Sequence, residues 1–458
     1  MAHIYLAATR KSSGKTTLSI GLSRALCRRG RKVQPFKKGP DYIDPLWLSR
    51  AAGRSCLNLD YHTTPAEEIQ AAFTRALADA DLGFIEGNVG LFDSVDLQGA
   101  YSNAELAKLI EAPVLLVVDV QGLGRGIAPL LLGYLAFDPA LRISGVILNK
   151  VGGARHEANL RRVVEYYTDL PVIGAVPRLA DITIEERHLG LMPSNEAQAA
   201  EATVERITEK VAAHVDLAAV ERIAETAATP PEPPPSPRTL PASTEPVRIG
   251  IARDDAFGFY YPDDLAALSA AGAELVPFSP VADTQLPDVD ALFIGGGFPE
   301  MRMQELEANT AMRTAVADFI RAGNAVYAEC GGLMYLTERL HWQGRCCRMC
   351  GVLRADVAMH DRPQGRGYVR LAETQAFPWP RRDGREPAEI HAHEFHHSAV
   401  ITPDPDWIYG YRVLRGQGVD GRHDGIVLGN LLANYAHLRD VGGVDWTGRF
   451  LAHVRALK

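Results

Sequence analysis

The stretch A-A-T-R-K-S-S-G-K-T-T, residues 7–17, follows the apolar run Ile4–Ala7 and leads into a segment, 16–29, with apolar residues at helical spacing. It ends in G-K-T-T, the pattern that closes a phosphate-binding loop, although Thr9 stands where such loops begin with glycine. Backbone N–H groups at a helix start attract phosphate. The stretch therefore predicts a strand, a phosphate loop and a helix.

Within this loop each residue type has a distinct use. Gly14 permits close backbone approach, Lys15 can reach the outer phosphates, and the hydroxyl of Thr16 can bind Mg²⁺. Glu86 follows the apolar run 83–85, and an acidic residue at the end of such a strand can hold the same metal. Asn149 ends the apolar run 143–149, where its side-chain amide can bind a nucleotide base. The alternative to a nucleotide site is that G-K-T stands at a helix start by chance.

Strand-like runs alternate with helical patterns on both sides of a proline-rich segment. This alternation predicts α/β architecture with parallel sheets. The segment rich in proline is interpreted as a semi-rigid linker, because proline disfavours helices and central strands. We predict domains at 1–228 and 247–458 with a linker at 229–246. The predicted strands are 4–7, 32–36, 83–85, 113–119, 143–149 and 171–176 before the linker, and 247–252, 274–278, 291–294 and 325–328 after it.

Composition excludes several classes of protein. The net charge of −8 argues against a general nucleic-acid binder. The longest uncharged apolar run, 127–137, is far too short to span a bilayer. The sequence shows no signal-peptide pattern, and its 6 cysteines do not form a disulfide framework. We therefore expect a cytoplasmic protein that binds neither nucleic acid nor membrane.

Two further stretches of the first domain carry polar residues. K-K-G-P-D-Y-I-D-P, residues 37–45, sets two lysines beside two aspartates in a loop stiffened by two prolines, and E-G-N-V-G-L-F-D covers 86–93. Taken alone, the first stretch is compatible with a well-capped turn. Beside a phosphate loop it indicates a substrate or metal loop.

In the second domain, A-E-C-G-G places Cys330 between the strand-like run 325–328 and a predicted helix at 333–340. A cysteine at such a strand-to-helix turn is exposed for attack, and the helix start favours its thiolate. A buried structural cysteine is the alternative. The glycine-rich loop 295–297 can offer backbone N–H groups to an oxyanion. Spacing alone cannot select a base among the 14 histidines.

These motifs, with E-R-H-L-G-L at 186–191, resemble the cobyrinate and hydrogenobyrinate a,c-diamide synthases of cobalamin biosynthesis. The resemblance runs from Ile4 to about Leu438. It implies an N-terminal domain similar to dethiobiotin synthetase, with a parallel sheet and a phosphate loop. It also implies a C-terminal α/β domain of the class I glutamine amidotransferase type.

The resemblance implies that ATP and Mg²⁺ serve to phosphorylate a peripheral carboxylate of a tetrapyrrole, which ammonia then attacks. Phosphorylation gives a poor electrophile a leaving group, and positioning and cations supply most of the catalysis. By match of motif, the residues that bind ATP are Gly14, Lys15, Thr16, Thr17 and Asn149. The metal is bound by Thr16, Glu86 and Asp41. The substrate carboxylate lies near Asp41, Tyr42, Asp44 and Asp93.

In the second domain the resemblance assigns Cys330 as nucleophile and His437, in A-N-Y-A-H-L, as base, with Gly296, Gly297 and Gly331 around the oxyanion and glutamine. Asn434 and Arg439 depart from the family pattern. Arg439 stands where many amidotransferases carry a glutamate, but an arginine accepts no hydrogen bond, so the third catalytic member stays open. The histidines of 393–398 are expected to serve the structure or to lie near the glutaminase site rather than to bind metal. The cysteines at 346, 347 and 350 are interpreted as ordinary core residues, because no second pair of ligands stands at zinc spacing.

The substrates implied are ATP, glutamine and a tetrapyrrole, and amidation of the a and c acetates of cobyrinate or hydrogenobyrinate is the leading hypothesis. Sirohaem or nickel-sirohydrochlorin is the alternative substrate. A different class of function also stays open, a non-catalytic ATP switch or scaffold with a decayed amidotransferase domain. A homodimer is compatible with the resemblance, and the role of Arg10, in the phosphate loop, is an open question.

Overall fold

The computed structural model describes residues 1–178, 186–187, 190–194, 200–230, 246–380 and 389–458. The chain divides into two compact units, Met1–Ser236 and Pro237–Lys458. Most of the linker predicted at 229–246 lies outside the described residues, as do His188 and Leu189 of the motif at 186–191.

The first unit is built on a seven-stranded sheet in the order β3-β2-β4-β1-β5-β6-β7, with every pair parallel. All strands predicted for this half are present; β3, an edge strand of three residues, was not predicted. The strands are β1 (Ala2–Ala8), β2 (Val33–Lys38), β3 (Leu57–Leu59), β4 (Leu82–Glu86), β5 (Val114–Asp119), β6 (Ile143–Val151) and β7 (Val172–Pro177), with a separate pair β8 (Glu186–Arg187) and β9 (Gly190–Leu191).

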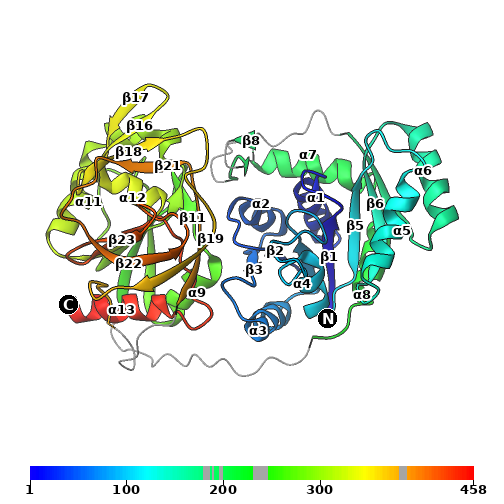
Figure 1. The fold of residues 1–458 in the computed structure, drawn as a ribbon, viewed down its shortest axis with the longest axis horizontal. Coiled ribbons are helices and arrows are strands. Elements are labelled where there is room, and N and C mark those ends of the chain that lie inside the picture. Colours follow the sequence, from blue (N-terminus) through cyan, green and yellow to red (C-terminus); the bar gives the residue numbers. More distant parts are fainter. Residues whose placement is uncertain (179–185, 188–189, 195–199, 231–245, 381–388) are drawn as a thin grey trace. The chain divides into compact units, whose positions relative to one another are not determined.

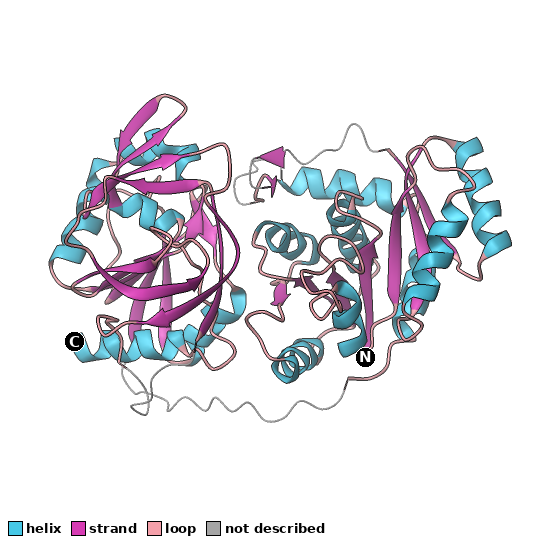
Figure 2. Cartoon of the chain, in the orientation of Figure 1, coloured by secondary structure: helices cyan, strands magenta, loops and turns pink. Residues whose placement is uncertain are grey.

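Helices cover this sheet and leave the carboxyl ends of its strands along one edge (Figures 1 and 2). Apolar side chains of α3 to α6 share one core with the strands, whereas α1 contacts α2, α7 and α8. Because β1 lies between β4 and β5, the loops that follow these strands converge. The helices are α1 (Lys15–Arg28), α2 (Ile43–Ala52), α3 (Ala66–Leu77), α4 (Asn103–Leu109), α5 (Ile127–Phe137), α6 (Ala154–Tyr167), α7 (Ala200–Ala212) and α8 (Leu217–Glu225).

The second unit contains a nine-stranded mixed sheet in the order β12-β10-β13-β15-β24-β23-β22-β19-β20. The strands from β12 to β24 are parallel and the remainder antiparallel. The predicted strands β10 (Val247–Ala252), β12 (Ala273–Phe278), β13 (Ala291–Ile294) and β15 (Ala325–Glu329) are all present and form the parallel part with β24 (Leu431–Asn434).

A four-stranded sheet, β17-β16-β18-β21, and a short pair, β11 with β14, complete the strands of this unit. The other strands are β11 (Phe257–Phe259), β14 (Gly296–Gly297), β16 (Thr337–Trp342), β17 (Arg345–Arg348), β18 (Leu353–Met359), β19 (Gly365–Glu373), β20 (Ile390–His396), β21 (Ser398–Ile401), β22 (Ile408–Arg415) and β23 (His423–Leu428). The helices are α9 (Pro262–Ala270), the short η1 (Pro299–Arg302), α10 (Met303–Ala308), α11 (Thr310–Arg321), α12 (Gly331–Leu336) and α13 (Trp446–Leu457).

The helix predicted at 333–340 is wrong in its second half. Helix α12 ends at Leu336, and Thr337 begins the strand β16. The Thr337 hydroxyl donates to the carbonyl of Met334 at 2.7 Å, and the Leu336 carbonyl accepts from the backbone N–H of Val352 at 3.0 Å. These bonds satisfy the last helical carbonyls and direct the chain into a strand.

Among the described residues, no helix combines the length and the apolar character needed to cross a lipid bilayer.

Candidate active sites

The phosphate loop is closed at its carboxyl end by Gly14, which caps α1 in the left-handed region at φ 86°. A Cβ at this position would lie 2.3 Å from Nδ2 of Asn149. That same nitrogen donates a 2.7 Å hydrogen bond to the carbonyl of Ser13. Glycine is thus required both for backbone conformation and for space. Asn149 contacts the loop, and its use in reading a nucleotide base stays a prediction.

Lys15, Thr16 and Thr17 form the first turn of α1 directly after this loop. The Lys15 ammonium donates to the carbonyl of Val89 at 2.6 Å, and burial lowers the pKa of Lys15 to about 8. The Thr16 hydroxyl donates to Oε1 of Glu86 at 2.9 Å. Glu86, at the end of β4, therefore contacts Thr16, the residue predicted to bind the same metal.

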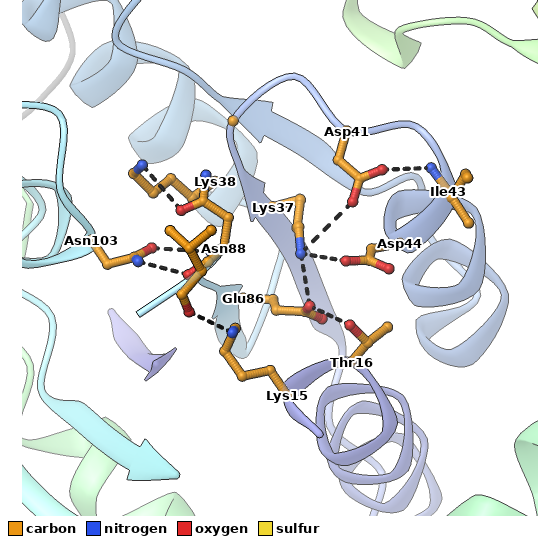
Figure 3. Close-up of polar contacts among 12 residues, drawn as sticks. Lys15, Thr16, Lys37, Lys38, Asp41, Ile43, Asp44, Glu86, Asn88 and Asn103 are labelled. Atoms are coloured by element: carbon orange, nitrogen blue, oxygen red, sulfur yellow. Dashed lines mark hydrogen bonds and ion pairs between the residues drawn. The ribbon is translucent and has the colours of Figure 1, made fainter. Parts of the chain in front are cut away.

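Three acidic side chains surround the ammonium of Lys37, the last residue but one of β2, which pairs with β4 (Figure 3). The Lys37 Nζ atom lies 2.5 Å from Oδ2 of Asp44, 2.8 Å from Oε1 of Glu86 and 3.9 Å from Oδ2 of Asp41. We call Asp41, Asp44 and Glu86 the carboxylate cluster. The structure thus joins two residues predicted as metal ligands and one predicted near the substrate around one buried cation.

Burial and this cation have opposite effects on the cluster. Burial would lower the pKa of Lys37, but Asp44 and Glu86 raise it well above its usual value. Burial and the neighbouring Asp44 raise the pKa of Asp41. Burial would also raise the pKa of Asp44, yet Lys37 holds it below its usual value. The ionised state of the cluster therefore depends on the Lys37 ammonium.

One oxygen of the cluster has no such partner. Oε2 of Glu86 is buried and accepts no hydrogen bond from any described residue. Because an unpaired buried carboxylate oxygen is costly, a position beside it suits a cation. Carboxylate oxygens and the Thr16 hydroxyl are ligand types that Mg²⁺ prefers, but the Lys37 ammonium occupies the centre of the cluster. The metal predicted from the sequence therefore fits beside Oε2 of Glu86 and not among all three acids.

Lys38 is a second buried lysine that sequence reasoning did not assign to the site. Its ammonium donates to Oδ1 of Asn88 at 3.2 Å, and burial lowers its pKa to about 8. Asn103 in turn donates to the Asn88 carbonyl at 2.8 Å (Figure 3). The K-K pair at the end of a buried strand was the available signal, since buried lysines are rare unless paired or functional.

The remaining predicted residues of this unit lie around the cluster. Asp93 accepts a 2.8 Å bond from the backbone N–H of Gly90 and so closes the loop that follows Glu86. It also lines a cavity of about 550 Å³. Tyr42 is nearly buried and directly precedes α2. Their proximity to a substrate carboxylate stays a prediction.

Arg10 pairs with Asp119, the last residue of β5. One guanidinium nitrogen of Arg10 lies 2.9 Å from Oδ2 of Asp119, and Lys150 Nζ lies 2.9 Å from the same oxygen. Lys150 also donates to the carbonyl of Ser12 at 3.0 Å. The Arg10 side chain is 68% exposed, so in this structure it braces the loop at the surface.

The second unit presents Cys330 on a sharp turn between β15 and α12. Its φ of 48° is rare for a residue other than glycine. A Cβ at Gly332 would lie 2.1 Å from the carbonyl oxygen of Ile294, and one at Gly331 would lie 3.0 Å from the backbone nitrogen of Gly297. The small residues after Cys330 therefore allow the strained turn that was predicted from A-E-C-G-G.

His437 lies against Cys330 and is buried. Its Nδ1 atom is 3.2 Å from Oε2 of Glu329, and its ring also hydrogen-bonds with Cys330. Burial by itself would lower the pKa of His437, but the bonds to Cys330 and Glu329 raise it to about 10. This arrangement favours an imidazolium directly beside the Cys330 side chain, as a cysteine nucleophile paired with a base requires.

The glycine-rich loop borders the same pair. A Cβ at Gly296 would lie 2.7 Å from Cε1 of His437. Gly297 pairs with Phe257 in the short β11–β14 sheet, which fixes the loop. The structure thus brings Gly296, Gly297 and Gly331 to Cys330 and His437, while their use as oxyanion donors stays a prediction.

Both departures from the family pattern have structural roles. The side-chain amide of Asn434 donates to the carbonyl of Ala436. Arg439 is buried, pairs with Asp263 and lies over the ring of Tyr261 at 4.5 Å. They stabilise the segment that carries His437, and Arg439 does not supply an acid.

The histidines and cysteines of the described residues form no metal centre. Within the described ranges, no group of three or more His, Cys, Asp or Glu side chains could hold a metal, the carboxylate cluster with Lys37 at its centre included. His396 stacks on Tyr435 with ring centroids 3.9 Å apart. Cys347 and Cys350 are buried as expected, but Cys346 is exposed on β17, so the interpretation of all three as core residues is wrong.

Comparison with known proteins follows the division into two units. The CobQ/CobB/MinD/ParA nucleotide binding domain matches residues 4–191, and the CobB/CobQ-like glutamine amidotransferase domain matches residues 248–440. A cobyrinate a,c-diamide synthase from Magnetococcus marinus is 48% identical over 97% of this chain and 95% of its own length. The chain belongs to this family.

Enzymes of the same name from two other organisms also match along almost their whole length. The Archaeoglobus fulgidus protein is 40% identical over 98% of this chain and 96% of its own length. The Methanosarcina acetivorans protein is 39% identical over 98% and 96%. A member of the cobyrinate a,c-diamide synthase family is a carbon–nitrogen ligase that takes nitrogen from glutamine. The nucleotide-binding and amidotransferase domains expected from the sequence are thereby confirmed.

Proposed function

We propose that this enzyme uses ATP and glutamine to amidate the a and c acetate carboxylates of cobyrinate or hydrogenobyrinate through acyl-phosphate intermediates. The observation that carries the proposal is the buried contact of Cys330 with His437 in the second unit. The first unit of the same chain has a phosphate loop beside Lys37 and the carboxylate cluster. The names of the relatives support the choice of substrate.

In the glutaminase reaction, Sγ of Cys330 attacks the carbon of the glutamine side-chain amide. His437 gives a proton to the departing nitrogen, ammonia leaves, and a thioester forms. Water then attacks the thioester carbon and gives a proton to His437; the carbon–sulfur bond breaks, and glutamate and Sγ of Cys330 are released. The raised pKa of His437 favours the imidazolium, which is the proton donor that the first step needs.

In the ligase reaction, an oxygen of the substrate carboxylate attacks the γ-phosphorus of ATP, and ADP leaves. Ammonia then attacks the acyl carbon, the carbon–oxygen bond to phosphate breaks, and the amide and inorganic phosphate are released. We assign the phosphates to the loop 7–17, with Lys15 and Lys37 as the nearby cations. Gly14 permits the close approach of the loop backbone.

A divalent metal fits beside Thr16, Glu86 and Asp41, because Oε2 of Glu86 is buried without a partner. When bound, Mg²⁺ supplies neutralisation of phosphate charge. We assign the substrate carboxylate to the neighbourhood of Asp41, Tyr42, Asp44 and Asp93. Burial and Asp44 raise the pKa of Asp41 to about 8, so Asp41 releases its proton when the metal binds.

The test is amidation by the purified full chain with ATP, Mg²⁺ and glutamine. Cobyrinate, hydrogenobyrinate, sirohaem and nickel-sirohydrochlorin are supplied in separate reactions, and mass spectrometry detects the change from carboxyl to carboxamide. We expect two amides on one of the first two compounds. Amidation of only a sirohaem-type compound would replace the proposed substrate, and ATP hydrolysis without glutamine consumption would indicate a switch protein instead.

A further inference from the structure

The acid that supports the catalytic histidine comes from an unexpected place in the chain. Glu329 is the last residue of β15 and directly precedes Cys330. Its side chain is 3% exposed, and Oε2 lies 3.2 Å from Nδ1 of His437. We propose that Glu329 is the positioning residue that completes the glutaminase triad, an inference that rests on the proposed roles of Cys330 and His437.

The sheet register explains how an acid next to the nucleophile can reach the base. Glu329 pairs with Asn434 across β15 and β24, and the chain continues from β24 into the segment that carries His437. The positive φ of Cys330 turns the chain away from the strand direction after Glu329. One residue can thus contact the ring of His437 from the strand while the next lies at the turn.

The carboxylate of Glu329 is fixed by two further donors. Oε1 accepts from the backbone N–H of Leu438 at 2.9 Å and from the Tyr327 hydroxyl at 2.5 Å. These bonds leave Oε2 directed at Nδ1 of His437. Because one donor is the backbone next to His437, the carboxylate fixes both the ring and the segment that carries it.

The contact determines which ring nitrogen serves Cys330. A carboxylate only accepts hydrogen bonds, so Nδ1 of His437 carries the proton toward Glu329. The other ring nitrogen is left to exchange a proton with the Cys330 side chain. The bond to Glu329 stabilises the imidazolium form of His437, as in other triads of nucleophile, base and acid.

Many glutamine amidotransferases carry their acid two residues after the catalytic histidine, and in this chain an arginine stands there. Arg439, two residues after His437, pairs with Asp263 and cannot accept a hydrogen bond. Asp424, a buried acid of β23, accepts from the backbone N–H groups of Tyr435 and Ala436 at 3.0 and 2.9 Å. Glu329 is the carboxylate that the structure places on the ring of His437.

The test is Glu329→Gln in the full chain, with Glu373→Gln as the matched control. Glu373 is also a buried glutamate of this unit, but it pairs with Arg449. We expect Glu329→Gln to lower the glutaminase kcat on the order of 100-fold with little change in KM for glutamine. Alkylation of Cys330 by iodoacetamide should slow as well, while amidation driven by ammonium chloride persists. Glu373→Gln should keep the wild-type alkylation rate.

A kcat for Glu329→Gln within about threefold of the wild-type value would overturn the proposal, since triad acids contribute far more. If Glu329→Gln does not fold, a measurement on the wild-type protein, by proton NMR, still tests the proposal. We expect a far-downfield proton resonance from the His437 N–H donated to Glu329, and it should vanish in His437→Gln. Its absence from the wild type would overturn the proposal. If Cys330→Ser keeps glutamine-driven activity, the proposed function fails first, independently of Glu329.

Discussion

Replacing Lys37 by methionine should destabilise the first unit, because it removes the cation that the carboxylate cluster surrounds. The Lys37 ammonium lies 2.5 Å from Asp44 and 2.8 Å from Glu86, and its side chain is 3% exposed. Removing one partner of a buried ion pair costs about 3–5 kcal/mol, since the remaining charge has no compensation. In a unit of this size, that loss corresponds to a melting temperature lower by about 6–20 °C.

Lys38→Met is the matched control, because the two lysines are adjacent and both buried. Burial lowers the pKa of Lys38 to about 8, so its ammonium costs folding free energy at neutral pH. Methionine removes this cost together with one bond to Asn88. We therefore expect Lys38→Met to be neutral or stabilising at pH 7, in contrast to Lys37→Met.

The two variants should also differ in pH dependence. In the wild type, Lys37 holds the pKa of Asp44 below its usual value, so this stabilising contribution is lost as the pH falls through that pKa. Without Lys37, burial raises the pKa of the cluster, and its carboxyl groups then stabilise the fold when they bind protons. The deficit of Lys37→Met should therefore shrink as the pH falls from 7 to 5.

The measurement is denaturant unfolding of the full chain at both pH values, with hydrogen exchange of peptides from β2 and β4 to follow the first unit. Equal stability of the two variants at pH 7 would refute the reasoning. A deficit of Lys37→Met that grows at lower pH would refute it as well, because it would show that the cluster does not carry net negative charge.

Three other substitutions test the loops. Gly14→Ala should abolish ATP binding in calorimetry, because the alanine Cβ would lie 2.3 Å from the Asn149 amide. Gly30→Ala is the control and should keep ATP binding, because Gly30 has a similar positive φ but no atom within 4 Å of a Cβ. Gly332→Ala should distort the turn at Cys330, with a stability loss of about 1–3 kcal/mol in thermal unfolding and slower alkylation of the thiol. Cys330→Ser should abolish amidation from glutamine but spare amidation from ammonium; loss of both would contradict the assignment of Cys330 to the ammonia supply.

The sequence predicted the parallel strands well because they are continuous apolar runs, buried on both faces. The edge strand β3 has only three residues, so it carries too little pattern to be recognised. The error at 333–340 has a similar cause. A short apolar segment at the end of a helix does not reveal that Thr337 captures a carbonyl of the last turn.

For the active sites, the sequence identified side chains by type but not their partners. The predicted residues Thr16, Glu86, Asp41 and Asp44 do meet, yet the ammonium of Lys37 at their centre was not assigned a role. Glu329 was missed because the search for an acid followed the pattern of residues after His437. Only the register of β15 with β24 shows that the residue before Cys330 reaches that histidine.

The ammonium of Lys37 also bears on how this enzyme is made in the cell. A site built from acidic side chains often depends on a metal to fold, since the bare charges repel each other. Here a residue of the same chain supplies the balancing charge. The newly synthesised protein can therefore mature before any magnesium arrives, and treatment with a chelator should leave the first unit folded.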